Sequence, residues 1–344
     1  MPARSRQGRG SLALLALVAL GCGPGADAAR TQAKPEAPAA EAPSAAPAEG
    51  SAEPAAPSPP APPRPAGTTR VLRPASAPFA AHPEVLVHLP EGLRPDRPLA
   101  LVVFLHGWFG CVDVVAGDAW APCRPGVGPP RAAMGVVGAF ERARVNALLV
   151  VPQLAFDAPS SDGGRLERKG GLRALVAELL ADDELGRALG RGRSPDDFAR
   201  VLLFAHSGAY DPLGALLAQG GLEAHEVHLL DALYQVPTSL ERWARASSKS
   251  LASGGKPARR LSVVYTDREK TGPRSVAFFH DILSPLTPAR RGAFALESAS
   301  GATPAEVELA RPFVLLRTMA THEDVPRVFL GPLLRSAGLV ELPP

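Results

Sequence analysis

The sequence lacks a basic face for nucleic acid, an internal repeat and a glycine-rich phosphate loop. Its 344 residues carry 37 Lys and Arg against 34 Asp and Glu, and the formal net charge of +3 comes from interspersed charges. The short basic clusters at 257–260 and 290–291 are typical of solvated loops, so no nucleic-acid partner is expected. There is no internal repeat, and the pairs Gly163-Gly164 and Gly170-Gly171 punctuate loops without forming a GxGxxG phosphate loop.

Long apolar runs are also scarce near the start of the chain. The apolar stretch 11–20 is too short to span a bilayer, and it lies between an arginine-containing start and Cys22. Residues 1–22 therefore resemble the signal segment of a bacterial lipoprotein. That resemblance implies a lipid attached to Cys22 and membrane association through it. The alternative is ordinary secretion with cleavage near Ala28 or Ala29, and both readings predict an exported protein.

Between Cys22 and Val71 no aliphatic residue is larger than alanine. Such a segment, rich in Ala, Pro, Glu and Ser, cannot bury a core, so residues 23–70 are predicted to be a disordered, extended spacer. The spacer places a domain of residues 71–344 at a distance from any anchor and carries no chemistry of its own.

Cysteine is rare, with three in the whole chain. If Cys22 is lipidated, Cys111 and Cys123 remain, and in an oxidising compartment they are predicted to form a disulfide. Closing a loop of this size contributes roughly 3 kcal/mol in the chain-entropy model. A metal site built from Cys111, Asp113 and Cys123 is the weaker alternative because it lacks the paired-ligand spacing of zinc sites.

Apolar, strand-like runs alternate with helical segments through the rest of the chain. This alternation predicts an α/β domain with a mostly parallel sheet. The predicted strands are 84–89, 99–105, 146–151, 200–205, 227–230, 261–266 and 313–319, and predicted helices include 131–144, 171–181 and 325–336. The Pro-, Arg- and Ala-rich segment 284–303 is predicted to be a long loop or a small cap.

A serine stands where one of these strands ends. The run 201–205 is followed by His206-Ser207-Gly208, and small residues, Ala205 and Ala209, lie two positions on either side of Ser207. This layout is typical of a nucleophile elbow, although the usual pattern has glycine at both alanine positions. The simpler alternative is a serine that caps the following helix.

The strand 99–105 ends in His106-Gly107-Trp108-Phe109-Gly110. With this loop and the serine turn, the chain resembles the α/β-hydrolase family. The resemblance implies a sheet of about eight strands with helices on both faces. It also implies an oxyanion hole made by the backbone N–H of Gly208 and that of Trp108 or Phe109, with His106 in a structural role.

In that family the order along the chain is serine, acid, histidine, so His322, after the last predicted strand, is the expected general base. Its alternative role is to cap the final helix. Two acids remain open: Asp231, in an apolar setting after 227–230, and Asp267, among charged neighbours after 261–266. Asp324 is too close to His322 along the loop and is read as a helix N-terminal charge.

These features predict a serine hydrolase that cleaves an acyl bond, with an ester as the first choice and a small or polymeric acyl compound as substrate. No cofactor or metal is expected because the triad needs none. Gln153, Phe156, Ser160 and Ser161 could line the pocket, although a plain loop is the simpler reading for any one of them. The alternatives are an amide or peptide hydrolase acting on cell-envelope material, and a binding protein that kept the fold without catalysis.

Overall fold

The computed structural model describes residues 67–267 and 270–343. The predicted signal segment 1–22, its lipidation site Cys22 and the spacer up to residue 66 lie outside these described residues. The last residues of the predicted spacer, 68–70, are not disordered, because they belong to a strand that pairs with residues 85–89. Within the described part of the chain, no helix is long and apolar enough to cross a membrane.

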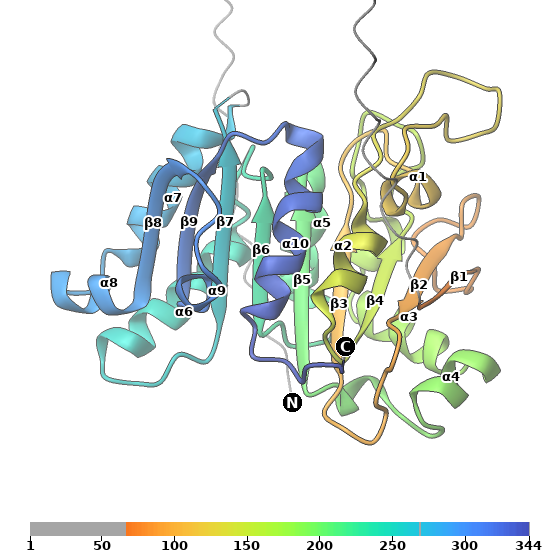
Figure 1. Ribbon diagram of the computed structural model, residues 1–344, viewed down its shortest axis with the longest axis horizontal. Helices are drawn as coiled ribbons and strands as arrows, with labels where there is room; N and C mark the ends of the chain where they lie inside the picture. Colours follow the sequence, from red (N-terminus) through yellow and green to blue (C-terminus); the bar gives the residue numbers. More distant parts are fainter. Residues whose placement is uncertain (1–66, 268–269, 344) are drawn as a thin grey trace, which may run out of the picture. The chain divides into compact units, whose positions relative to one another are not determined.

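A nine-stranded sheet in the order β1-β2-β4-β3-β5-β6-β7-β9-β8 forms the centre of the described domain (Figure 1). The strands are β1 (Thr68–Leu72), β2 (Val85–Leu89), β3 (Ala100–Leu105), β4 (Ala147–Pro152), β5 (Arg200–His206), β6 (Glu226–Leu230), β7 (Arg260–Thr266), β8 (Ala295–Gly301) and β9 (Phe313–Thr318). The β1-β2 and β2-β4 pairs are antiparallel, and every other pair is parallel.

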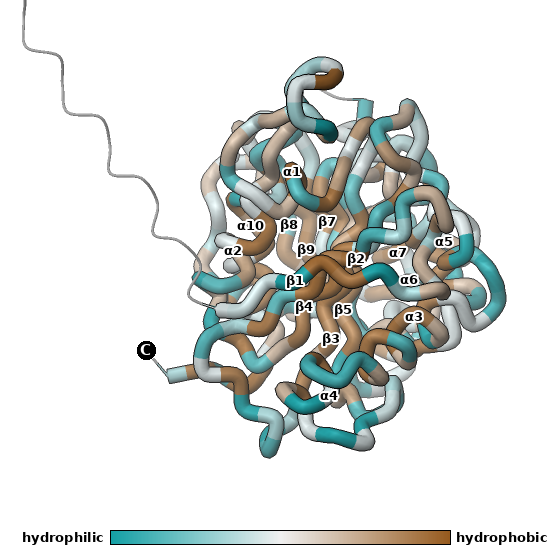
Figure 2. The backbone as a smooth tube through the Cα atoms, turned by 90° about the vertical axis from the view of Figure 1, so that its right-hand side faces the viewer, coloured by the Kyte–Doolittle hydropathy of each residue, from teal (hydrophilic) through white to brown (hydrophobic). Residues whose placement is uncertain are grey.

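Helices cover both faces of the sheet, which is the arrangement that a parallel sheet requires (Figures 1 and 2). One face carries α1 (Val112–Ala116), α2 (Val136–Ala143), α9 (Glu306–Leu309) and α10 (Val325–Arg335). The other carries α3 (Gly171–Leu180), α4 (Asp183–Leu189), α5 (Tyr210–Gln219), α6 (Thr238–Ala252) and α7 (Thr271–Leu283).

The central strands are buried on both faces, and β3 and β4 are the continuous apolar runs that this position favours. Every residue of β3, β4, β6 and β7 is buried. Alternate side chains along these strands enter the two cores, so that Val103 packs with α3 and α5 while Val102 and Phe104 pack with α2 and α10. The α/β fold with a mostly parallel sheet is thus as predicted, with nine strands where about eight were expected.

The segment 284–303, predicted as a loop or cap, instead contains α8 (Pro288–Phe294) and β8. β8 pairs in parallel with β9 and forms one edge of the sheet, at the opposite end from β1. None of its residues is buried, so it has no apolar run to mark it as a strand in the sequence. Pairing to β9 decides its conformation.

The parallel strands place their carboxyl ends along one edge of the sheet, where α/β folds bind ligands. The loops after β3, β4, β5, β6, β7 and β9 therefore converge. These loops carry all the candidate catalytic residues named from the sequence.

Candidate active site

Ser207 directly follows β5 and is the first residue of the 3₁₀ turn η3 (Ser207–Ala209), which leads directly into α5. Its φ of 56° is in the left-handed region, which non-glycine residues seldom adopt. Ala205 and Ala209 are both fully buried, so alanine is small enough for this elbow. Strain of this kind persists where the surrounding structure holds it and is concentrated at functional sites.

The loop after β3 approaches Ser207 closely. A Cβ on Gly107 would lie 2.5 Å from the Cβ of Ser207, so only glycine fits there. Buried His106 holds this loop: its Nδ1–H donates to the Gly107 carbonyl at 2.9 Å, and its Nε2 accepts from the Leu154 N–H at 3.0 Å. The side-chain oxygen of Gln153 accepts from the Val112 N–H at 3.0 Å, which ties the loops after β3 and β4 together.

The two N–H groups that were alternatives for the first oxyanion donor, those of Trp108 and Phe109, differ in their hydrogen bonding. The N–H of Phe109 donates to the carbonyl of Ala158 at 2.7 Å and is therefore occupied. The N–H of Trp108 has no such backbone acceptor among residues 67–267 and 270–343. Gly208 lies in the first turn after the elbow, where N–H groups have no intrahelical partner and the helix dipole favours a negative charge. Trp108 and Gly208 are thus the better-suited pair.

His322 and Asp231 come together although they are distant in sequence. His322, in the 3₁₀ turn η4 (His322–Asp324) after β9, contacts the Asp231 Oδ2 through Nδ1 at 2.7 Å. Asp231 is fully buried at the end of β6 and also accepts from the N–H of Thr266 at 3.1 Å and from the hydroxyls of Thr266 and Thr271.

Burial alone would raise the pKa of Asp231, but the hydrogen bonds from His322, Thr271 and Thr266 outweigh it, and the pKa falls below its usual value. An ionised carboxylate requires the facing ring nitrogen to be the donor, so Nδ1 of His322 carries the proton. Nε2 is then the basic nitrogen of the ring, as a general base needs.

Asp267 lies elsewhere. Its side chain is 53% exposed and forms an ion pair with Arg317 of β9, with the Arg317 Nε 2.7 Å from Oδ2. Asp324 accepts a hydrogen bond from the hydroxyl of Thr321 at 2.6 Å. Of the two acids that the sequence left open, the structure brings Asp231, and not Asp267, to the histidine.

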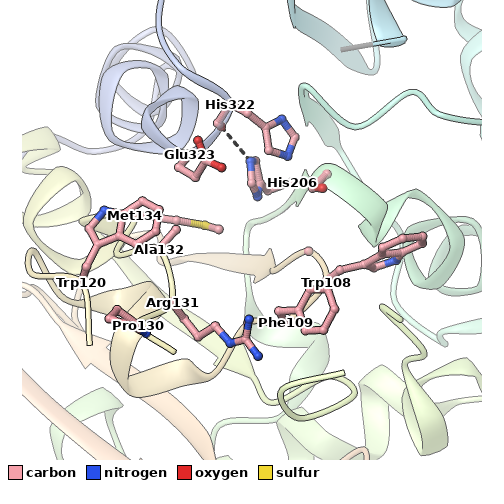
Figure 3. Close-up of a pocket in the computed structure, with 13 residues that line it drawn as sticks. Trp108, Phe109, Trp120, Pro130, Arg131, Ala132, Met134, His206, His322 and Glu323 are labelled. Atoms are coloured by element: carbon pink, nitrogen blue, oxygen red, sulfur yellow. Dashed lines mark hydrogen bonds between the residues drawn. The ribbon is translucent and has the colours of Figure 1, made fainter. Parts of the chain in front are cut away.

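His206 is a site residue that the sequence reasoning did not single out. Its ring lies beside the His322 ring with centroids 4.5 Å apart, and its Nε2–H donates to the His322 carbonyl at 2.9 Å (Figure 3). The hydrogen bond fixes the backbone of the turn that carries His322. The only sequence signal is its position directly before Ser207.

A pocket of about 230 Å³, called the serine pocket below, is lined by Ser207, His206 and His322 together with Phe109, Trp120 and Met134. Arg131 also lines it, paired with Asp157 at 2.5 Å and stacked 4.6 Å from the centre of the Phe109 ring (Figure 3). Trp120 stands on the loop closed by the Cys111–Cys123 disulfide, which the structure contains as the sequence predicted. The disulfide thus braces one wall of this pocket.

Three of the four buried histidines in the described part of the chain, those with the most strongly lowered pKa values, predict how stability depends on pH. Burial lowers the pKa of His106 and of His228 to about 4, and burial with the nearby His322 ring lowers that of His206 to about 3. In the unfolded chain these rings titrate at about pH 6.5, so below that pH the unfolded state binds protons that the folded state does not. The stability that the neutral, buried rings contribute is fully present above pH 6.5 and is lost as the pH falls.

We expect the free energy of unfolding in urea to fall between pH 6.5 and 4.5 by about 1 kcal/mol per pH unit for each of these histidines. In a His228→Asn variant, the free energy of unfolding should fall less steeply with pH, by about 1 kcal/mol per pH unit, whatever the absolute stability of the variant. An unfolding free energy that stays constant from pH 7 to pH 4.5 would contradict buried, neutral rings.

Comparison with known proteins supports the fold. No protein-family model and no curated protein sequence matches the chain. A mutant of the feruloyl esterase module from Clostridium thermocellum, solved in complex with sinapinate, matches 83% of this chain and 93% of its own with a TM-score of 0.51 and 10% identity. A ferric enterobactin esterase from Salmonella typhimurium (78% of this chain, 57% of its own, 12% identity, TM-score 0.43) is also similar.

A third similar structure is a substrate-bound, fluorophosphonate-binding serine hydrolase from Staphylococcus aureus. It matches over 78% of this chain and 98% of its own, at 10% identity and a TM-score of 0.38. At these identities the likeness concerns the fold alone, and the domain has the α/β-hydrolase fold. The chemistry has to be argued from the site itself.

Proposed function

We propose that this protein is a serine hydrolase that cleaves esters through Ser207, His322 and Asp231. The observation that carries the proposal is the 2.7 Å contact between His322 Nδ1 and a buried, ionised Asp231, with Ser207 on a strained elbow in the same pocket. A buried carboxylate that orients a histidine beside a serine is the arrangement that activates a hydroxyl for attack on an acyl carbon.

In the proposed reaction, the Ser207 Oγ attacks the ester carbonyl carbon and His322 Nε2 accepts its proton. The N–H groups of Trp108 and Gly208 stabilise the negative oxygen of the tetrahedral intermediate, each contributing about 2.7–4 kcal/mol to lowering the barrier. His322 then gives its proton to the departing alcohol as the C–O bond breaks. Water, activated by the same histidine, attacks the acyl-enzyme and releases the carboxylic acid and free Ser207.

Hydrolysis of 4-nitrophenyl esters of short fatty acids by the purified chain tests this proposal. We expect turnover with accumulation of an acyl group on Ser207 early in the reaction, detected as a mass increase of the protein. Well-folded protein that neither turns over these esters nor acquires the acyl group would favour a binding protein with a hydrolase fold.

We further propose that the protein acts outside the cytoplasm, attached through Cys22 when that residue is lipidated. The disulfide is the supporting observation, because disulfides persist in oxidising compartments. In bacterial cells that express the full chain, we expect the protein in the membrane fraction and the Cys22→Ala variant released from it. Recovery of both forms from the cytoplasm, with reduced Cys111 and Cys123, would refute the proposed location.

A further inference from the structure

A second pocket, of about 440 Å³, borders the oxyanion donors without including Ser207, His206 or His322 in its lining. Trp108 lines both this pocket and the serine pocket. Its indole lies against Gly208, where an added Cβ would be 2.5 Å from Nε1, and it points away from His206 and His322 (Figure 3). The Trp108 side chain is therefore the wall that the two pockets share.

The lining of this second pocket is acidic. It includes Asp162, Glu167 and Asp211, and no lysine, arginine or histidine among the residues described. Asp162 and Glu167 each accept one backbone N–H at 2.7 Å through a single oxygen. We call this space the carboxylate pocket.

Asp211, in the first turn of α5, has no ion pair or hydrogen bond with its side chain in the described part of the chain. The Asp211 charge acts on Tyr210, which also lines the pocket. Burial is the largest cause of the raised pKa of Tyr210, the Asp211 charge is the second, and Arg274 from α7 opposes both. Because the described lining holds carboxylates and no cation, it leaves a negative potential that attracts a positive ligand group.

Ser161 gives a second and independent indication of a ligand. It lines the carboxylate pocket, it is 4% exposed, and its Oγ has no hydrogen-bond partner among the described residues. The same oxygen would lie 2.8 Å from a Cβ on Gly208, so it stands next to the oxyanion site. A buried hydroxyl without a partner costs free energy, and a donor from a bound substrate would satisfy it.

We propose that the carboxylate pocket binds a protonated amine on the acyl part of the substrate, next to Ser161 and Asp211. This rests on the proposed esterase function. The leaving alcohol must lie on the His322 side, because His322 protonates it, and His322 lines only the serine pocket of the two. The acyl chain then extends past Gly208 toward the carboxylate pocket, so the substrate class is an ester of an amino-substituted acid.

Two esters that differ in one terminal group test this: 4-nitrophenyl 6-aminohexanoate, which ends in an ammonium group, and 4-nitrophenyl heptanoate, which ends in a methyl group. We expect the wild type to hydrolyse the ammonium ester at least as efficiently as the neutral one. In Asp211→Asn, the ratio of kcat/KM for the ammonium ester to that for the neutral ester should fall about fivefold, a modest factor because Asp211 is exposed.

The matched control is Asp183→Asn. Asp183 is likewise an exposed acid in the first turn of a helix, α4, and lines neither pocket, so its substitution should leave the ratio unchanged. Ser161→Ala is the second test variant and should also lower the ratio, because it removes the hydroxyl that faces the amine. A ratio that is the same in wild type, Asp211→Asn and Ser161→Ala would overturn the proposal.

Labelling with a fluorophosphonate separates this inference from the proposed function. Wild-type protein that is labelled and hydrolyses heptanoate but discriminates strongly against the ammonium ester has an active serine and no amine site. Protein that is not labelled and hydrolyses neither ester contradicts the hydrolase itself.

Discussion

Replacing Ser207 with alanine is expected to lower kcat for ester hydrolysis by about 10⁴-fold or more, since the acyl-enzyme route is lost and the oxyanion donors alone supply the remaining rate. Ser207 is half-buried, and removing its hydroxyl leaves the elbow, β5 and α5 in place. The unfolding midpoint should therefore change little. Steady-state rates of 4-nitrophenyl ester hydrolysis, with thermal unfolding as the check on folding, measure the effect.

Ser284→Ala is the matched control for this substitution. Ser284 is exposed at the C-terminal end of α7 and lines neither the serine pocket nor the carboxylate pocket. Hydrolysis of a neutral ester should stay within about tenfold of wild type, far above the Ser207→Ala rate. Equal losses for both variants, or retained activity in Ser207→Ala, would contradict Ser207 as nucleophile.

Replacing Asp231 with asparagine is expected to lower kcat by about 10⁴-fold, because an amide no longer requires His322 to carry its proton on Nδ1. The ring can then present a protonated Nε2 to Ser207, and a protonated nitrogen cannot act as a base. Part of the loss also follows from disturbing the hydrogen bonds of Thr266 and Thr271. The loss of activity in Asp231→Asn is measured from the rate of 4-nitrophenyl ester hydrolysis and from the pH profile of kcat/KM.

The comparison variant is Asp267→Asn, at the other acid that the sequence left open. Asp267 is exposed and paired with Arg317, and an exposed ion pair contributes about 0–1 kcal/mol to stability. We therefore expect wild-type kcat within about twofold. Should Asp267→Asn be the inactive variant and Asp231→Asn the active one, the assignment of the acid is wrong.

The sequence predicted those parts of the fold that depend on local pattern. β3 and β4 are continuous apolar runs and β7 is largely apolar, and each was expected within a few residues of its observed bounds. β8 was missed because all its residues are half-buried or exposed and owe their conformation to pairing with β9. Edge strands of this kind carry little intrinsic signal.

The choice between Asp231 and Asp267 could not be made from the local sequence pattern alone. Both follow neighbouring parallel strands, β6 and β7, so both stand at the same edge of the sheet. Which of them meets His322 depends on the turn after β9, 91 residues away from Asp231 in the sequence. The apolar setting of Asp231 was the one usable clue, since a buried carboxylate needs a partner.

The serine pocket could not be predicted for a similar reason. Trp120, Arg131 and Met134 come from the loop that the Cys111–Cys123 disulfide closes and from the segment after it. Nothing in their spacing indicates that they face Ser207. The contact of Trp108 with Gly208, which separates the two pockets, likewise joins residues that lie far apart in the chain.

Reaction of the wild type with a fluorophosphonate, followed by mass spectrometry of its peptides, tests the central claim most directly. The account predicts one modified residue, Ser207, with labelling lost in His322→Ala and strongly slowed in Asp231→Asn. Folded wild-type protein that remains unmodified, or that is modified at another serine, would contradict an activated Ser207.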